Sequence, residues 1–115
     1  MTNESSPLTP AELQILLSLA DGEQHGYGIM QEVAGRTDGR TKIGPGTLYG
    51  TIKRLLAAGM IVESARRPDP RLDDQRRRYY RITAAGKRAL AEEIRAMADI
   101  VALARKRRIL AASAL

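Results

Sequence analysis

Residues 44–62 have the sequence GPGTLYGTIKRLLAAGMIV, and the hydrophobic period changes inside this stretch. The residues before Gly59 carry apolar side chains at helical spacing, and glycine is a common residue just after a helix end. Residues 60–62 have the composition of a β-strand. We therefore predict a helix over residues 47–58. Residues 44–46 are predicted to interrupt regular structure before the helix, and a strand follows it directly.

The predicted helix 47–58 has two distinct faces. At about 100° per residue, its apolar stripe contains Leu48, Ile52, Leu55 and Leu56. The opposite face carries Gly46, Thr47, Gly50, Lys53, Arg54 and Ala57, with Tyr49 on its flank. Small residues allow a helix to approach a DNA groove closely, and Thr47, Lys53 and Arg54 can donate to base edges. The Tyr49 hydroxyl can reach a phosphate. This pattern favours a recognition helix, although an ordinary solvated helix face carries similar residues.

Two shorter helices are predicted before this stretch. Thr9-Pro10 followed by Glu12 has the pattern of a capped helix start, and Asp21-Gly22 ends that segment. The second helix is predicted over residues 25–35. Residues 41–43 have the composition of a brief strand.

A β-hairpin is predicted after the third helix. Its strands are residues 60–62 and 79–82, and residues 68–74 form a turn-rich loop between them. The hairpin is rich in arginine: Arg66, Arg67, Arg71, Arg76, Arg77, Arg78 and Arg81. Guanidinium groups on a protruding ribbon can pair with phosphates and enter a narrow minor groove. Of these we assign Arg66, Arg67, Arg76, Arg77 and Arg78 to a DNA-binding wing. The alternative is an edge hairpin whose charges protect it from aggregation.

A long helix is predicted from the Thr83 cap towards Ser113. Its apolar stripe consists of Leu90, Ile94, Met97, Val101 and Ala104. The three-helix unit already has its own core, so we expect this stripe to form a dimer interface. The alternative is a helix that packs back on its own domain. The chain is thus predicted to comprise a flexible tail (1–8), a DNA-binding domain (9–82) and a dimerisation helix (83–115).

Composition narrows the function classes. The 115 residues include 19 Lys and Arg against 13 Asp and Glu, a net charge of +6 that favours a polyanionic partner such as nucleic acid, or an anionic membrane surface. The absence of cysteine excludes disulfides and thiol chemistry. His25 is the only histidine, so we predict no metal site, no cofactor and no enzymatic activity. We find no signal peptide and no membrane span, and we expect a soluble cytoplasmic protein.

The element order is helix, helix, helix, strand, strand, long helix. It predicts a mainly α fold with a small β-hairpin, a winged helix-turn-helix with a C-terminal dimerisation helix. Such a dimer is expected to bind duplex DNA sequence-specifically at a pseudo-palindromic operator and to regulate transcription. His25 and Lys42 are further candidates for phosphate contacts. The alternative function is an interaction module that docks an acidic protein or RNA.

Several motifs resemble those of the PadR family of transcriptional regulators. They are LTP at 8–10, HGYGI at 25–29, GTLY at 46–49, RLL at 54–56 with GMI at 59–61, and RYYRIT at 78–83 followed by Gly86. The resemblance covers roughly residues 8–92, and the chain length is similar to that of the short subfamily.

The resemblance implies a homodimeric repressor that acts on nearby promoters and leaves DNA when a small molecule binds. It also implies that Tyr49 and its neighbours contact DNA and that the hairpin arginines form the wing. Short members can bind planar drugs in an apolar pore between subunits, stacked on tryptophan. This chain contains no tryptophan to provide such stacking.

Overall fold

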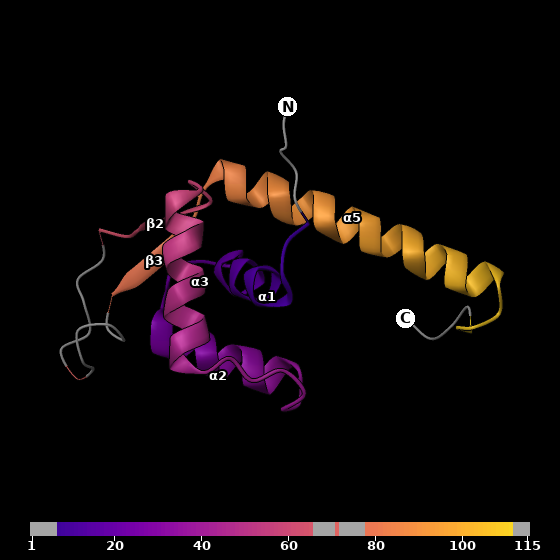
Figure 1. Ribbon diagram of the computed structural model, residues 1–115, viewed down its shortest axis with the longest axis horizontal. Helices are drawn as coiled ribbons and strands as arrows, with labels where there is room; N and C mark the ends of the chain where they lie inside the picture. The colour runs from indigo at the N-terminus through magenta and orange to yellow at the C-terminus, as the bar shows by residue number, and fades with distance from the viewer. Residues whose placement is uncertain (1–6, 66–70, 72–77, 112–115) are drawn as a thin grey trace.

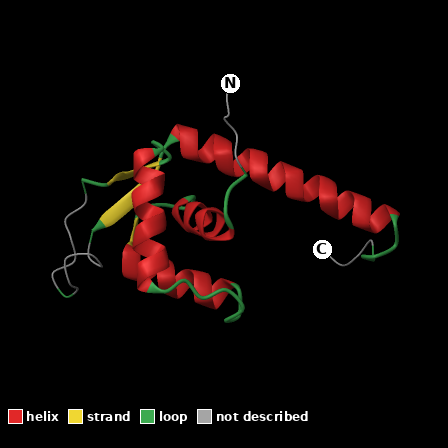
Figure 2. Ribbon diagram, viewed as in Figure 1, coloured by secondary structure: helices red, strands yellow, loops and turns green. Residues whose placement is uncertain are grey.

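The computed structural model describes residues 7–65, 71 and 78–111. This part of the chain contains four helices and a small antiparallel sheet, as a mainly α winged helix-turn-helix requires (Figures 1 and 2). Three helices and the sheet form the body, and the last helix extends away from it (Figure 1). The predicted fold class is confirmed.

Helix α1, Pro10–Leu19, begins as predicted. The Glu12 amide donates to Thr9 Oγ1 at 3.1 Å, and Glu12 Oε1 accepts from the Thr9 amide at 2.8 Å. This capping box satisfies two backbone donors that a helix start otherwise leaves without partners. The helix ends shortly before the predicted stop at Asp21-Gly22.

Strand β1, Gln24–His25, leads directly into helix α2, Gly26–Arg36. The strand was not predicted because two residues are too short to show a period. His25 is the N-cap of α2, and its Nδ1 accepts from the Gly28 amide at 2.9 Å. The brief strand predicted at residues 41–43 is wrong, since these residues lie in the loop after α2 and are not part of the sheet.

Helix α3 spans Pro45–Ala57. The prediction that residues 44–46 interrupt regular structure is therefore wrong for Pro45. This proline occupies the first helical turn, where its missing N–H would have no intrahelical acceptor. The buried stripe also differs from the prediction. Leu48, Ile52 and Leu55 are buried together with Thr51, whereas the expected Leu56 is 37% exposed. The helix ends at Ala57, and Gly59 follows its C-cap Ala58 with a φ of 74°, as expected of the predicted stop.

Strands β2, Ile61–Glu63, and β3, Tyr79–Ile82, are the two predicted strands. They pair antiparallel with Ile61 opposite Ile82, and β1 pairs with the other edge of β3, which gives the order β1-β3-β2. The predicted hairpin is therefore part of a three-stranded sheet. Most of its loop lies outside the described residues.

One apolar core joins these elements, and it draws on every helix. Its buried members are Ile15, Leu16, Leu19, Ile29, Val33, Ile43, Leu48, Ile52, Leu55, Ile61, Tyr80, Ile82 and Leu90. Arg36 adds a polar link between α2 and α1, because its Nη2 donates to Ser18 Oγ at 3.1 Å and to the Gln14 backbone oxygen at 3.1 Å. The core therefore fixes α3 against α1, α2 and the sheet.

Helix α5, Ala84–Lys106, starts after the predicted Thr83 cap, whose Oγ1 accepts from the Gly86 amide at 3.1 Å. It ends earlier than predicted, because Arg108 adopts a left-handed conformation (φ 62°) just beyond the last turn. Ser113 lies outside the described residues. At 1.5 Å per residue, the 23 residues of α5 span about 35 Å. Most of this length lies beyond the body (Figure 1).

Candidate nucleic-acid interface

Helix α3 turns a small, polar face to solvent. Thr47, Lys53 and Arg54 are exposed, as are Gly46 and Ala57. Gly50, between them, is half-buried, and a Cβ added there would meet only Arg54 Nη1, at 4.0 Å. The outward face therefore combines small residues with three side-chain donors, as predicted from the helical period.

Tyr49 lies on the flank of this face and points into the body. Its ring packs against the core, and its hydroxyl oxygen is buried. A Cβ on Gly26 would lie 2.8 Å from that oxygen, so the ring occupies space that only a glycine leaves open. The structure thus does not present the Tyr49 hydroxyl to a phosphate. Instead, Tyr49 joins α3 to the first turn of α2.

Arg54 already has partners within the chain. Its Nη2 donates to Thr51 Oγ1 at 3.1 Å, and its Nε lies 3.9 Å from Glu12 Oε2. The guanidinium is still 59% exposed, whereas Glu12 is 18% exposed. Glu12 was not among the predicted site residues, because its capping role accounts for it locally. In the fold it also holds the side chain that was predicted to contact bases.

The wing is described only in part. Arg78 is exposed, and its Nη1 lies 3.3 Å from Glu63 Oε1 on the neighbouring strand. Arg66, Arg67, Arg76 and Arg77 lie outside the described residues. Beside Arg78, burial and the nearby Glu63 carboxylate raise the pKa of the Tyr80 hydroxyl, and the Arg78 charge opposes this shift. Strand β3 thus carries a buried phenol opposite Glu63 of β2.

His25 directly precedes α2, and Lys42 lies in the loop that follows it. His25 is half-buried, caps α2 through Nδ1, and its ring centroid is 5.1 Å from that of Tyr79. The cap role accounts for His25 without a phosphate. Lys42 is exposed in the loop before α3.

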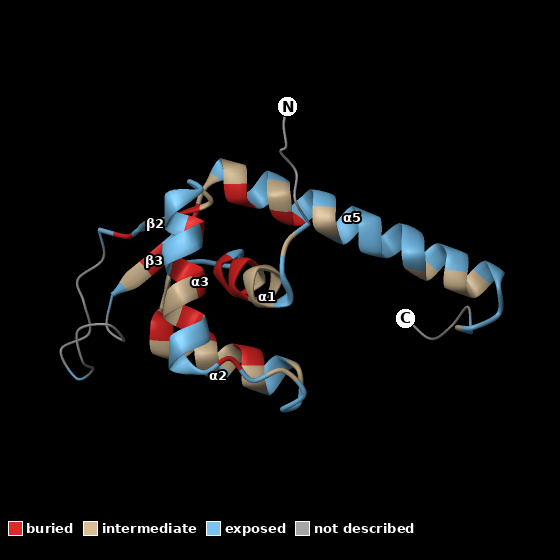
Figure 3. Cartoon of the chain, viewed as in Figure 1, coloured by how far each residue is buried: buried red, intermediate tan, exposed pale blue. Residues whose placement is uncertain are grey.

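The outer part of helix α5 is mostly exposed (Figure 3), and several of its exposed residues are large and apolar. Ile94 is 43% exposed, Met97 40%, Ile100 67% and Leu103 48%. Val101 and Ala104 are half-buried within the single chain. Ile100 and Leu103 were not predicted, although stepping by three from Met97 finds both.

Leu90 does not belong with this exposed stripe. It is only 6% exposed and lies in the core of the body. Its assignment to a dimer interface is therefore withdrawn, since the chain's own body covers it. The first turns of α5 are part of the body, and the free apolar face begins near Ile94.

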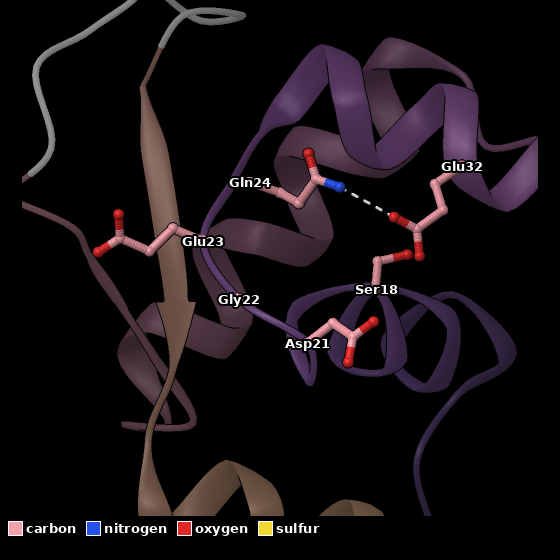
Figure 4. A pocket seen from close by; sticks show the side chains of 6 residues that line it. All are labelled: Ser18, Asp21, Gly22, Glu23, Gln24 and Glu32. Carbon is pink, nitrogen blue, oxygen red and sulfur yellow. Dashed lines mark hydrogen bonds between the residues drawn. The ribbon is translucent and has the colours of Figure 1, made fainter.

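A small hollow on the body, of about 170 Å³, has an acidic lining (Figure 4). Asp21 and Glu32 line it beside Ser18, and Gln24 Nε2 donates to Glu32 Oε1 at 2.9 Å. Glu23 turns towards the sheet, where it accepts from Ser64 Oγ at 2.5 Å. The carboxylates make this hollow unsuitable for a phosphate, so it is not part of the candidate DNA surface.

Within residues 7–65, 71 and 78–111, no three His, Cys, Asp or Glu side chains are grouped to hold a metal ion. None of the described helices has the length and apolar character needed to cross a bilayer. The described part of the candidate site consists of the exposed face of α3, Arg78 before β3 and the projecting helix α5. This arrangement defines the class of winged helix-turn-helix proteins.

Comparisons with known proteins identify the family. Residues 15–92 match the transcriptional regulator PadR-like family. A transcriptional regulator of Mycobacterium tuberculosis is 41% identical over 88 residues, which are 76% of this chain and 76% of that protein. The chain therefore belongs to the PadR-like family of transcriptional regulators, and the resemblance seen in its motifs is confirmed.

Solved structures show the same fold. A transcriptional regulator from Clostridium thermocellum superposes with a TM-score of 0.68 at 27% identity, covering 84% of this chain and 87% of that one. Bacillus subtilis PadR, solved in complex with operator DNA, gives a TM-score of 0.60 at 23% identity, covering 72% of this chain and 45% of that one.

Proposed function

We propose that this regulator is a cytoplasmic homodimeric repressor that binds duplex DNA sequence-specifically at a pseudo-palindromic operator. The observation that carries the proposal is the exposed face of α3, where Thr47, Lys53 and Arg54 stand among small residues. A helix with such a face can lie in the major groove and donate to base edges. The operator complex of Bacillus subtilis PadR, a protein of the same fold, supports duplex DNA as the partner.

The apolar face of α5 supports the homodimer. Large apolar side chains from Ile94 to Leu103 remain exposed on the single chain. Burying apolar surface contributes about 25 cal/mol per Å² removed from water, so this face gains by meeting a second copy. Two α3 helices held about 34–36 Å apart then meet successive major grooves.

The basic wing supports contacts to the flanking backbone. Arg78, which belongs to the predicted wing, is exposed directly before strand β3. If each subunit neutralises about four phosphates, log K falls with log salt with a slope of about −7. Helix α3 offers few bidentate donors, so half-site spacing and DNA shape contribute to specificity beside Arg54.

Titration against the DNA upstream of its own gene, with a random duplex as control, tests the proposal. Arg54→Ala is expected to reduce the ratio between the two affinities, because it removes a base donor. The paired change Arg76→Ala and Arg77→Ala is expected to weaken binding to both duplexes and to flatten the salt dependence. Lys106→Ala is the matched control, because it removes one positive charge at the far end of α5.

Two results decide against the proposal. Equal affinity of the wild-type protein for both duplexes would favour the interaction module that docks an acidic protein or RNA. An equal loss on both duplexes after Arg54→Ala would remove Arg54 from the base contacts. Small-molecule release of the repressor is a further part of the proposal, and its support is the family alone.

A further inference from the structure

Helices α3 and α5 are connected through a compact junction, formed by Gly59, Met60, Thr83 and Gly86. The Thr83 hydroxyl donates to the Gly59 carbonyl oxygen at 2.6 Å, and the Thr83 amide donates to the Met60 oxygen at 2.9 Å. Thr83 Oγ1 also accepts from the Gly86 amide as the N-cap of α5. One side chain thus joins the turn after α3 to the first turn of α5.

Gly86 brings the two backbones together at this junction. It is buried, and a Cβ added there would overlap the Met60 carbonyl oxygen and lie 2.8 Å from Ile82 Cγ1. The nearest obstacle is backbone, so a larger residue cannot be accommodated by turning a side chain. Only glycine allows α5 to lie this close to the turn that ends α3.

Two more contacts hold α5 beyond the junction. Leu90 is buried in the core, and Glu93 Oε1 accepts from the Leu8 amide at 3.1 Å, just before α1. The exposed apolar face begins directly after these contacts. The direction of that face relative to α3 is therefore set within one chain, before any partner binds.

The length of α5 amplifies small changes at the junction. At 1.5 Å per residue, Gly86 lies about 6 Å from Leu90 along the axis, and Ile100 lies about 15 Å beyond Leu90 on the other side. With Leu90 as the pivot, a displacement on the order of 1 Å at Gly86 moves Ile100 by about 2.5 Å. This is close to the rise of about 3.4 Å between successive base pairs.

We infer that the junction of Thr83 and Gly86 with Gly59 and Met60 determines which operator half-site spacing the dimer accepts. The inference rests on the proposed function. In the dimer, α5 holds one subunit against the other, and α3 holds each subunit on DNA. The angle between α5 and α3 therefore fixes the distance and rotation between the two recognition helices. Thr83 and Gly86 are positioning residues that do not contact DNA.

The test compares spacing preference with single-site affinity. Binding is measured to a duplex with one half-site and to a set of duplexes whose two half-sites are separated by the natural distance or by one or two base pairs more or fewer. Gly86→Ala and Thr83→Val are the test variants. The matched controls are Gly35→Ala, which adds the same methyl where nothing lies within 4 Å, and Thr83→Ser, which keeps the hydroxyl.

The expected result is a change in preference at unchanged single-site affinity. Both test variants keep the dimer in sedimentation and bind the single half-site within about twofold of wild type. Their preference for the natural spacing moves to another spacing or falls by about tenfold, a difference of about 1.4 kcal/mol. The two controls keep the wild-type preference.

Different outcomes of this test would overturn the inference and refute the proposed function. An unchanged spacing profile in a folded, dimeric Thr83→Val protein overturns the inference, and so does a uniform loss at every spacing. If Gly86→Ala does not fold, the comparison of Thr83→Val with Thr83→Ser decides alone. Failure of the wild-type protein to bind any half-site instead refutes the proposed function.

Discussion

Single side chains at the candidate site are held by contacts with the rest of the body, some of them packing contacts and some polar. Tyr49 leaves the exposed face of α3 and lies over Gly26 at the start of α2. Arg54 bends back to Thr51 and Glu12. Tyr80 is buried in strand β3 and has a raised pKa. Tyr49 and Arg54 thus tie α3 to the starts of α2 and α1.

Gly26→Ala is expected to lower the free energy of unfolding by about 1–3 kcal/mol, because its methyl would lie 2.8 Å from the Tyr49 hydroxyl oxygen. Gly35→Ala in the same helix meets nothing within 4 Å and should raise stability by about 0.5–1 kcal/mol. Urea unfolding of both variants measures the difference. Equal effects of the two substitutions would contradict the packing of Tyr49 on Gly26.

The pKa of Tyr80 predicts alkaline behaviour. Burial and the Glu63 carboxylate raise the folded-state pKa above 10.0, so the folded protein holds this proton more tightly than the unfolded chain does. The resulting stabilisation is complete below pH 10 and is lost as pH rises through the folded-state value. Tyr80→Phe should remove the last phase of tyrosinate absorbance in an alkaline titration. An unchanged final phase would contradict the assignment.

At the scale of elements, three helices end in the same way. After α2, α3 and α5, the backbone amide of the second residue beyond the C-cap donates a hydrogen bond to a carbonyl oxygen in the last turn. The pairs are Gly39 to Ala34, Met60 to Leu55, and Ile109 to Ala104. The residue before it has positive φ in each case, 54° at Asp38, 74° at Gly59 and 62° at Arg108. This is the Schellman motif, which glycine fits best.

At these three positions, replacing glycine should therefore lower the free energy of unfolding, and introducing glycine should raise it. Gly59→Ala should destabilise by about 1–2 kcal/mol, because a Cβ strains the left-handed conformation. Arg108→Gly should relieve that strain and stabilise the end of α5. Asp38→Gly should stabilise less, since aspartate tolerates this region better than other residues. Thermal unfolding ranks the variants, and a stabilising Gly59→Ala would contradict the motif.

At the scale of the whole molecule, the first turns of α5 are packed into the body and its outer part is exposed. Leu90 is part of the core, whereas Met97 and Ile100 remain exposed. Loss of Leu90 should affect the folding of each chain, with Leu90→Ala lowering stability by about 2–5 kcal/mol. A change at Met97 or Ile100 should instead affect the association of two chains.

The double change Met97→Glu and Ile100→Glu is expected to give a folded monomer, because two carboxylates would be buried without partners in the interface. The slope of log K against log salt should then fall from about −7 to about −3.6, since one subunit contacts half the phosphates. Ala102→Glu places a charge on an exposed part of the same helix, outside the apolar stripe, and is the control. Sedimentation and salt titration measure both effects. A dimeric double variant would place the interface elsewhere.

Much of this architecture follows from short segments. The capped start of α1, the end of α3 before Gly59 and the cap of α5 at Thr83 were all predicted, because capping and helical period depend on residues within a few positions of one another. The polar face of α3 follows from the same period. So does the basic character of the wing, which is a matter of composition alone.

Other features depend on contacts between distant segments. Strand β1 exists because β3 pairs with it, and Thr51 replaces Leu56 in the core because of where α1 and α2 lie. Leu90 belongs to the body and not to the free face of α5, and Gly86 matters because the Met60 carbonyl lies against it. Periodicity shows which residues share a face of a helix. Only the packed chain decides what that face meets, because burial depends on neighbours far away in the sequence.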